Sequence, residues 1–397
     1  MKRRRLAFLA CMVWIVLGLN FLAVAEPATG PWDLDALAAV PEVEWVDSTG
    51  PVRGLYYTGK PYRDKPTRVF AYYALPEFRK GPVPAMVLVH GGGGKAFKEW
   101  AELWARAGYA AIAMDLAGRG PDGEPLPDGG PDQTHKQKFD DITGGVKNAW
   151  PYHAVANVLR AVSLIRSFDA VDAERVGITG ISWGGYLTCI VSGLDKRLKA
   201  AVPVYGCGFL HENSAWLDTF AKLSPADKQA WVENFDPSTY LPGCAMPILF
   251  VNGTNDFAYP LDSYRKSYRL VTGPRTLCVT VEMPHGHPQG WAPPEIMVFA
   301  DSVLRKGRPV PRFESLTRTG RSVVGTYRSR TPVKGAQLHY TTDRNTWNKR
   351  KWHSVDADTE RNTVRATLPD AEVSAYFLTV ADQRGMIASS EHEELGR

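Results

Sequence analysis

Residues 176–186 read Val-Gly-Ile-Thr-Gly-Ile-Ser-Trp-Gly-Gly-Tyr, and this stretch decides the fold. Val176–Thr179 is a short apolar run typical of a buried strand, and Trp183–Leu194 has the composition of a helix. Residues 180–184 match the pattern G-x-S-x-G at the junction between the two. The two glycines leave room for a tight turn that exposes the serine oxygen, and the helix N-terminus favours developing negative charge. The pattern therefore predicts that Ser182 is a nucleophile.

Strands and helices alternate on both sides of this motif. Short β segments come first, at Glu42–Val46, Val52–Tyr57 and Thr67–Leu75. Buried-type strands are expected at Ala85–Val89, Tyr109–Met114, Ala200–Tyr205, Ile248–Asn252 and Leu277–Met283, with helices at Ala96–Ala107, Ala154–Phe168, Pro260–Val271 and Glu295–Leu304. This alternation predicts an α/β fold, a mostly parallel sheet with helices on both faces. In such sheets the chemistry collects at the carboxyl ends of the strands.

A serine nucleophile needs a base and a carboxylate, and both follow later strands. Asp256 comes directly after the strand Ile248–Asn252 and is the candidate acid; its alternative role is to cap the following helix. After the next strand the chain reads Met-Pro-His285-Gly-His287. A Gly-His pair a few residues past the strand favours His287 as the base, whereas an immediate His-Gly favours His285. We take His287 as the first choice and keep His285 as the alternative.

The oxyanion hole has a candidate in His90 and the four glycines that follow it, after the first buried strand. Glycines let backbone N–H groups approach a reacting oxygen without obstruction by side chains. We expect one donor from Gly92 or Gly93 and the second from the Trp183 N–H. The run lacks the Gly-Lys-Ser/Thr ending of a phosphate-binding loop.

With these residues assembled, the chain resembles the α/β-hydrolase superfamily across roughly residues 45–305. Residues 180–186 look like the G-x-S-x-G-G-Y signature of the branch that holds prolyl oligopeptidases, acetylxylan esterases and dienelactone-hydrolase-like enzymes. The resemblance implies a triad of Ser182, Asp256 and a histidine, with no metal or organic cofactor. Oligopeptidases of that branch carry a large β-propeller before the hydrolase domain. Fewer than 70 residues separate the N-terminal segment from His90, which favours an esterase over a propeller-less peptidase or amidase.

Residues 1–25 have the layout of a secretory signal peptide. Four basic residues precede an apolar run, and Ala23-Val-Ala25 offers small residues for cleavage after Ala25. The run is also long enough to be retained as a membrane anchor. Without this segment, 43 basic residues face 42 acidic ones, so no excess charge points to nucleic acid. We expect a secreted or periplasmic protein, in contact with a membrane only if the segment is kept.

After the N-terminal segment we expect two domains, a catalytic domain at residues 26–307 and a tail at residues 308–397. The tail has short strands with turn residues between them, typical of an immunoglobulin- or fibronectin-like β-sandwich. Four cysteines remain after residue 25, and none has the spacing of a metal site, so we expect buried thiols.

Tryptophans indicate the substrate class. We expect Trp150, Tyr152, Trp216 and Trp291 to rim the pocket, where aromatic faces could stack on sugar rings. Ordinary packing is the alternative. Acetyl or other acyl esters of carbohydrate are therefore the expected substrates. In the tail, Trp347 and Trp352 are expected to be structural rather than to bind carbohydrate.

Overall fold

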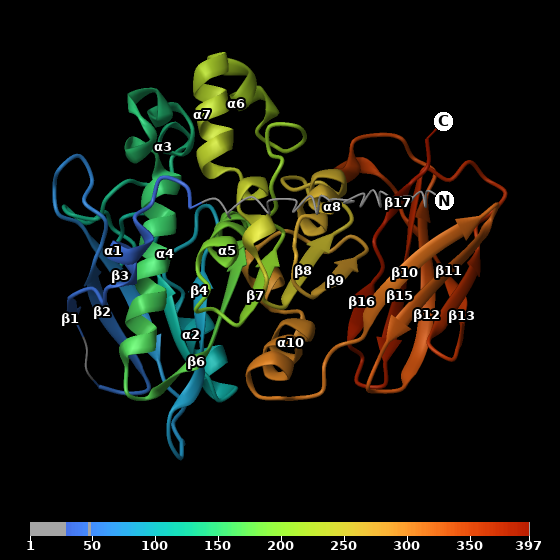
Figure 1. The fold of residues 1–397 in the computed structure, drawn as a ribbon, viewed down its shortest axis with the longest axis horizontal. Helices are drawn as coiled ribbons and strands as arrows, with labels where there is room; N and C mark the ends of the chain where they lie inside the picture. The colour runs from blue at the N-terminus through green and yellow to red at the C-terminus, as the bar shows by residue number, and fades with distance from the viewer. Residues whose placement is uncertain (1–28, 47–48, 397) are drawn as a thin grey trace, which may run out of the picture.

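The computed structural model describes residues 29–46 and 49–396 (Figure 1). The predictions for residues 1–25 lie outside this part of the chain. None of the helices within the described residues is long and apolar enough to cross a membrane.

The first unit is a nine-stranded sheet with the order β1-β2-β3-β5-β4-β6-β7-β8-β9. Its strands are β1 (Val43–Trp45), β2 (Val52–Thr58), β3 (Arg68–Ala74), β4 (Val83–Val89), β5 (Ala110–Met114), β6 (Val171–Ile181), β7 (Ala200–Val204), β8 (Ile248–Gly253) and β9 (Arg275–Thr280). The first three form an antiparallel edge, and β5, β4, β6, β7, β8 and β9 run parallel. The predicted parallel sheet is therefore confirmed.

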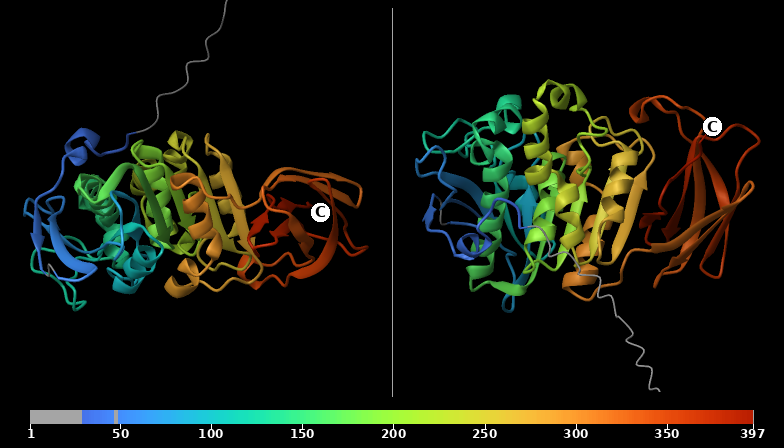
Figure 2. Two further views of the ribbon diagram at one scale, coloured as in Figure 1. Left: turned by 90° about the horizontal axis from the view of Figure 1, so that it is seen from below. Right: turned by 45° about the horizontal axis from the view of Figure 1, so that its top comes forward.

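Helices cover both faces of this sheet (Figure 2). They are α1 (Leu34–Ala38), α2 (Lys98–Arg106), α4 (Trp150–Ser167), α5 (Trp183–Leu194), α8 (Leu261–Arg269), α9 (His287–Trp291) and α10 (Pro294–Leu304). Chain order reverses at β4, which pairs with β5 on one side and β6 on the other. In open α/β sheets, ligands bind at such a switch point, beyond the carboxyl ends of the strands.

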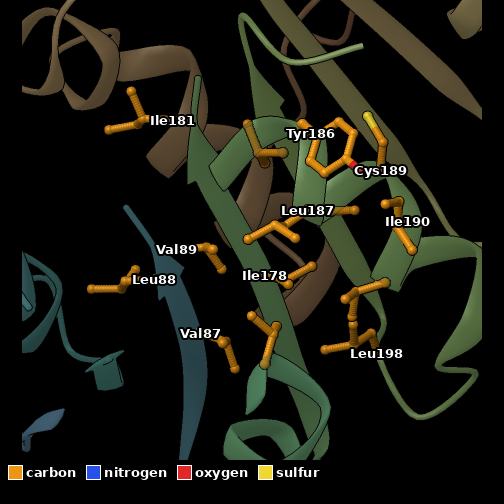
Figure 3. Packing of buried hydrophobic residues seen from close by; sticks show 14 of the residues in the cluster. Val87, Leu88, Val89, Ile178, Ile181, Tyr186, Leu187, Cys189, Ile190 and Leu198 are labelled. Atoms are coloured by element: carbon orange, nitrogen blue, oxygen red, sulfur yellow. The ribbon is translucent and has the colours of Figure 1, made fainter. Parts of the chain in front are cut away.

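The core beneath the switch point holds α5 against the central strands. Figure 3 shows Leu187 of α5 beside Ile178 of β6 and Val89 of β4. All three side chains are buried and belong to one apolar cluster. The four cysteines at positions 189, 207, 244 and 278 are also buried and free, as expected.

A small helical layer, here called the cap, covers one end of the sheet (Figure 1). It consists of residues 135–148, with α3 (His135–Lys138), η1 (Asp140–Gly144) and η2 (Val146–Asn148), and residues 217–235, with α6 (Leu217–Lys222) and α7 (Pro225–Phe235). Phe139 stacks on Trp231 at 5.4 Å and joins the two segments. Residues 116–148, a stretch rich in Gly, Pro and Asp, are thus partly helical. The helices within residues 135–148 are three to five residues long, which is too short to give a periodic hydrophobic signal in the sequence.

The second unit is an eight-stranded antiparallel sheet with the order β10-β11-β14-β13-β12-β15-β16, to which β17 adds by pairing with β15. Its strands are β10 (Arg312–Thr319), β11 (Ser322–Arg328), β12 (Val333–Thr341), β13 (His353–Glu360), β14 (Thr363–Thr367), β15 (Ala375–Asp382), β16 (Ile387–Ser389) and β17 (Glu393–Glu394). One short helix, η5 (Trp347–Lys349), interrupts it. The prediction that the tail consists of β-strands is therefore confirmed.

The two units pack through an apolar cluster and several ion pairs. Leu261 and Val279 of the first unit meet Trp347, Trp352 and Phe377 of the second. Both tryptophans are buried there, at 5% and 8% exposure, so neither presents a ring to a carbohydrate. Ion pairs join Arg265 to Glu394 and Arg269 and Arg275 to Glu391 around this cluster.

Candidate active site

Ser182 stands on a sharp turn between β6 and α5. Its backbone has φ of 58°, a region that residues other than glycine rarely enter. The strain is held by hydrogen bonds on both sides, from the Ser182 N–H to the Val204 carbonyl and from the Tyr186 N–H to the Ser182 carbonyl, each 2.9 Å. A strained, partly exposed serine at this junction has the geometry of a nucleophile elbow.

The acid of the site is held by its neighbours in the chain. Asp256 is buried at 3% exposure, and its Oδ1 accepts hydrogen bonds from the Ala258 N–H at 2.9 Å and the Tyr259 N–H at 2.7 Å. Its Oδ2 lies 2.6 Å from His285 Nδ1. The carboxylate therefore orients the His285 ring and sets its tautomer, with the proton on Nδ1 and a free lone pair on Nε2. That lone pair is what a general base requires.

The preference for His287 over His285 as the partner of Asp256 is wrong in this geometry. The chain turns directly after β9, so His285 already reaches the β8 loop, while His287 opens helix α9. His287 Nε2 instead accepts a hydrogen bond from the Gly91 N–H at 2.9 Å. Its acceptor is already used, so His287 supports the glycine loop.

Tyr205, which follows β7, is a further site residue that the sequence did not indicate. Its ring stacks on His285 with centroids 4.2 Å apart, and its hydroxyl donates to the Pro284 carbonyl at 2.7 Å. The two contacts fix the histidine loop from the β7 side. A tyrosine at the end of a buried strand gives no signal in one sequence, because it reads as core.

Two histidines beside the glycine loop stay neutral: His90, which is buried, and His287, which is partly buried. Burial lowers the pKa of His90 and of His287 to about 4, whereas histidine in an unfolded chain titrates near about 6.5. Between these values the unfolded chain binds more protons, so the folded state is expected to lose stability as the pH falls from about 6.5 toward about 4. Urea unfolding midpoints measured between about pH 8 and pH 5 test this expectation.

The variant His287→Gln separates this effect from other titrations. Glutamine can still accept from the Gly91 N–H but does not ionise. Asp115 acts in the opposite sense, because burial raises the pKa of its carboxyl to about 6. The drop in midpoint on acidification should therefore be smaller in His287→Gln than in the wild type; an equal drop contradicts the assignment.

The glycine loop lies against the nucleophile. A Cβ on Gly91 would stand 2.9 Å from the Ser182 Cβ, and one on Gly92 would stand 3.1 Å from the Trp183 ring. Gly93 has open space around it. Gly92 is thus the glycine next to Trp183, whose own N–H opens helix α5 and has no carbonyl partner within that helix. Of the two candidates, Gly92 is better placed than Gly93 to share an oxyanion with Trp183.

Tyr259 also reaches the nucleophile. Its ring is fully buried, 5.3 Å from Trp216 and 6.4 Å from His285 between centroids. Burial raises the pKa of its hydroxyl well above the usual value, and the Ser182 side chain beside it acts in the opposite direction. The tyrosine thus forms a wall of the site between the serine and the histidine.

The expected aromatic rim is only partly present. Trp150 and Tyr152 are buried at 1% and 4% exposure, which contradicts their placement at the pocket. The reason is that α4 begins at Trp150 rather than at Ala154, with Pro151 in its first turn, a position that proline favours. Trp216 and Trp291 remain partly exposed. Trp216 contacts Trp183 at 4.6 Å, and Trp291 stacks on Trp100 at 5.4 Å.

The acid loop is tied to the second unit through Asn255, the residue before Asp256. Its Nδ2 donates to the carbonyls of Arg350 at 2.6 Å and Asn348 at 3.3 Å. Its Oδ1 accepts from the Thr254 hydroxyl at 2.7 Å. The β-sheet unit therefore holds the loop that carries the acid.

Two family profiles and one curated relative match parts of the chain. The acetyl xylan esterase (AXE1) family profile matches residues 34–216, and the profile for PhoPQ-activated pathogenicity-related proteins matches residues 221–349. The chain is 23% identical over 237 residues to the acetyl esterase Axe7A of Xylanibacter ruminicola, which covers 55% of this chain and 52% of that protein. The chain thus spans about half the length of this relative.

Two solved structures share the architecture of the first unit. The acetyl xylan esterase from Paenibacillus sp. R4 superposes with a TM-score of 0.56 at 22% identity, over 68% of this chain and 92% of that one. Acetyl xylan esterase 1 from Thermoanaerobacterium sp. JW/SL YS485 gives 0.51 at 21% identity, over 64% and 91%. The first unit therefore shares its fold with these acetyl xylan esterases, and residues 34–216 match the profile of that family.

Proposed function

We propose that this chain is a serine esterase that cleaves carboxylic esters through an acyl-enzyme. The observation that carries the proposal is the Asp256–His285 pair at 2.6 Å, at the same sheet edge as the strained Ser182. The three residues follow β8, β9 and β6, the chain order Ser, Asp, His of α/β-hydrolases.

The first half-reaction acylates the serine. His285 Nε2 takes the hydroxyl proton as Ser182 Oγ attacks the ester carbonyl, and the Gly92 and Trp183 N–H groups receive the oxyanion. Asp256 stabilises the imidazolium that forms. The tetrahedral intermediate then collapses: the bond to the alcohol oxygen breaks, and His285 returns its proton to that oxygen.

The second half-reaction removes the acyl group. A water molecule gives its proton to His285 and attacks the acyl carbonyl, with the same two N–H groups holding the oxyanion. Collapse returns the proton to Ser182 and releases the carboxylic acid. In both half-reactions the chain contributes three side chains and two backbone N–H groups.

We further propose acetyl or other acyl esters of carbohydrate as substrates, supported by the match of residues 34–216 to the acetyl xylan esterase family. The N-terminal segment supports export, cleavage after Ala25 and a secreted or periplasmic location. The C-terminal unit is proposed to be an immunoglobulin- or fibronectin-like sandwich with a structural role. Its antiparallel pairing and the buried Trp347 and Trp352 support that role.

The mature protein tests the proposal against three substrate classes: p-nitrophenyl acetate, acetylated xylan, and alanyl- or prolyl-p-nitroanilides. Hydrolysis of the esters with the anilides untouched is expected, because the described residues before the glycine loop form α1 and strands β1 to β4 of the hydrolase sheet rather than a propeller. Acetate release from xylan distinguishes a carbohydrate esterase from a general one.

The matched control is Ser182→Ala, measured beside the wild type and checked for folding by circular dichroism. Ester cleavage at equal rates in the two proteins would refute the serine assignment. Efficient anilide cleavage that depends on Ser182 would make the chain a peptidase instead.

A further inference from the structure

Lys138 is a buried lysine beside the candidate oxyanion hole that the proposed mechanism does not use. It ends helix α3 in the cap and is 9% exposed. Its backbone is fixed at both ends: its N–H donates to the Thr134 carbonyl at 3.1 Å, and its carbonyl accepts from Trp231 Nε1 at 2.8 Å. These two hydrogen bonds fix the backbone of Lys138 and so fix the direction in which its side chain leaves the helix.

The ammonium group lies between the glycine loop and the residue after the nucleophile. Lys138 Nζ is 4.8 Å from the centroid of the Trp183 ring and 5.7 Å from that of Trp150. A Cβ on Gly92 would stand 3.5 Å from the same atom. Gly92 is itself exposed, so the ammonium borders the surface that a substrate must reach.

No carboxylate of the described residues forms an ion pair with Lys138. The acidic groups of the neighbourhood pair elsewhere, Asp132 with Arg119 at 3.6 Å and Asp141 with Lys136 at 3.8 Å. Burial lowers the pKa of Lys138 to about 8, and Asp132 acts in the opposite direction, so the group still carries its charge near neutral pH. A buried cation is costly without an anion, and the two tryptophan rings offset only part of that cost.

The adjoining surface holds the Arg119–Asp132 ion pair and a further cation, Lys95. A cavity of about 340 Å³ opens on the other side of the glycine loop, lined by Gly93, Gly94, Lys95, Arg119 and Gln133 among others. The amide oxygen and nitrogen of Gln133 are buried there without a hydrogen-bond partner among the described residues. This side of the site thus offers Lys95 and the unused amide of Gln133 to an incoming ligand.

The position of Lys138 also indicates which part of an ester substrate it would contact. The leaving alcohol must lie beside His285, which returns the proton to it. Lys138 lies instead against Gly92 and Trp183, the two groups proposed to hold the oxyanion. A group bound by Lys138 therefore belongs to the acyl part of the substrate.

We propose that Lys138 binds a carboxylate in the acyl part of the substrate, so that the enzyme prefers half-esters of dicarboxylic acids over neutral acyl esters. This inference rests on the proposed esterase function and names the acyl class for the same site. The carboxylate completes the ion pair that Lys138 lacks, and it places the carbonyl carbon in front of Ser182.

The kinetic test compares mono-p-nitrophenyl succinate with p-nitrophenyl butyrate, a neutral ester of similar length, after subtraction of spontaneous hydrolysis. Lys138→Met is expected to lower the ratio of kcat/KM for the charged over the neutral ester by about 10- to 100-fold, the size of one charge-assisted hydrogen bond. Lys138→Arg should keep part of the preference. The matched control is Lys136→Met, on the same helix but exposed, which should leave the ratio unchanged.

Two outcomes would overturn the inference. One is an unchanged ratio in Lys138→Met. The other is an equal loss on both esters, which would make Lys138 a structural support of Trp183 or a general stabiliser of the oxyanion. If Lys138→Met does not fold, a binding measurement on a protein that keeps Lys138 tests the inference instead.

Binding without turnover separates this inference from the proposed function. In Ser182→Ala, tryptophan fluorescence should report tighter binding of monomethyl succinate than of dimethyl succinate, because Trp183 and Trp150 flank the ammonium. Equal binding of the two would refute the role of Lys138. If neither nitrophenyl ester is hydrolysed but the monoanion still binds preferentially, the esterase proposal fails and the carboxylate site stands. If neutral esters are turned over with no preference for the charged one, the esterase proposal stands and the carboxylate site fails.

Discussion

His285→Ala is expected to lower kcat for ester hydrolysis by about 10⁴-fold or more, close to the loss expected for removing the serine itself. His285 is the histidine whose Nδ1 meets Asp256 at 2.6 Å, and Asp256 has its other oxygen held by two backbone N–H groups. Without the imidazole, nothing takes the serine proton or returns it to the alcohol. The measurement is kcat on p-nitrophenyl acetate, beside the wild type and Ser182→Ala.

His287→Ala is the matched control for this prediction. It removes the acceptor of the Gly91 N–H and leaves that donor unsatisfied, which typically costs about 1–3 kcal/mol of stability. Its effect on kcat should be far smaller than that of His285→Ala and should appear with a lowered unfolding midpoint. An inactive His287→Ala beside an active His285→Ala would restore the assignment favoured from the sequence.

Gly184→Ala is expected to destabilise the fold by more than about 4 kcal/mol, enough to remove most soluble protein. The Cβ it adds would stand 1.9 Å from the Val89 carbonyl oxygen of β4 and 2.7 Å from that of His90. Both obstacles are backbone, so relief requires α5 to move away from β4, which separates the nucleophile from the glycine loop. Soluble yield and urea unfolding measure the effect.

Gly335→Ala provides the comparison within the same chain. This glycine lies in β12, and a Cβ there meets nothing within 4 Å. Its stability should stay within about 0.5 kcal/mol of the wild type. A Gly184→Ala protein that unfolds at the wild-type midpoint would mean that α5 does not approach β4 as closely as described.

The elements around the serine could be predicted because each carries a local signal. The sequence predicts the helix Trp183–Leu194 with both of its observed ends, and the strands of the parallel part within three residues, except that β6 begins five residues earlier, at Val171. Apolar runs flanked by glycine and proline predict such elements from residues that are close together in the sequence. The G-x-S-x-G pattern adds a steric demand, since the Gly184 position has no space for a side chain.

The choice between the two histidines could not be made in the same way. They are two residues apart, and which one meets Asp256 depends on where β9 ends and α9 begins. The structure ends β9 at Thr280 rather than at Met283, so the loop turns earlier and His285 reaches the acid. Element boundaries are the least certain part of a sequence analysis.

Lys138 was missed for a different reason. In the sequence it stands among charged residues of a loop rich in Gly, Pro and Asp, where a lysine reads as a solvated side chain. The packing of Phe139 on Trp231, Phe220 and Trp183 buries this segment. Tertiary contacts of that kind have no signature within a few residues.

The tie between Asn255 and the second unit bears on how the sequence of this protein can diverge. The acceptors that hold Asn255 are main-chain carbonyls of residues 348 and 350, which every amino acid supplies. The loop that carries them can therefore change its side chains freely while its backbone path stays constrained. Relatives that have this support need not have the same side chains at these positions. It would therefore be recognised by superposing structures rather than by aligning sequences.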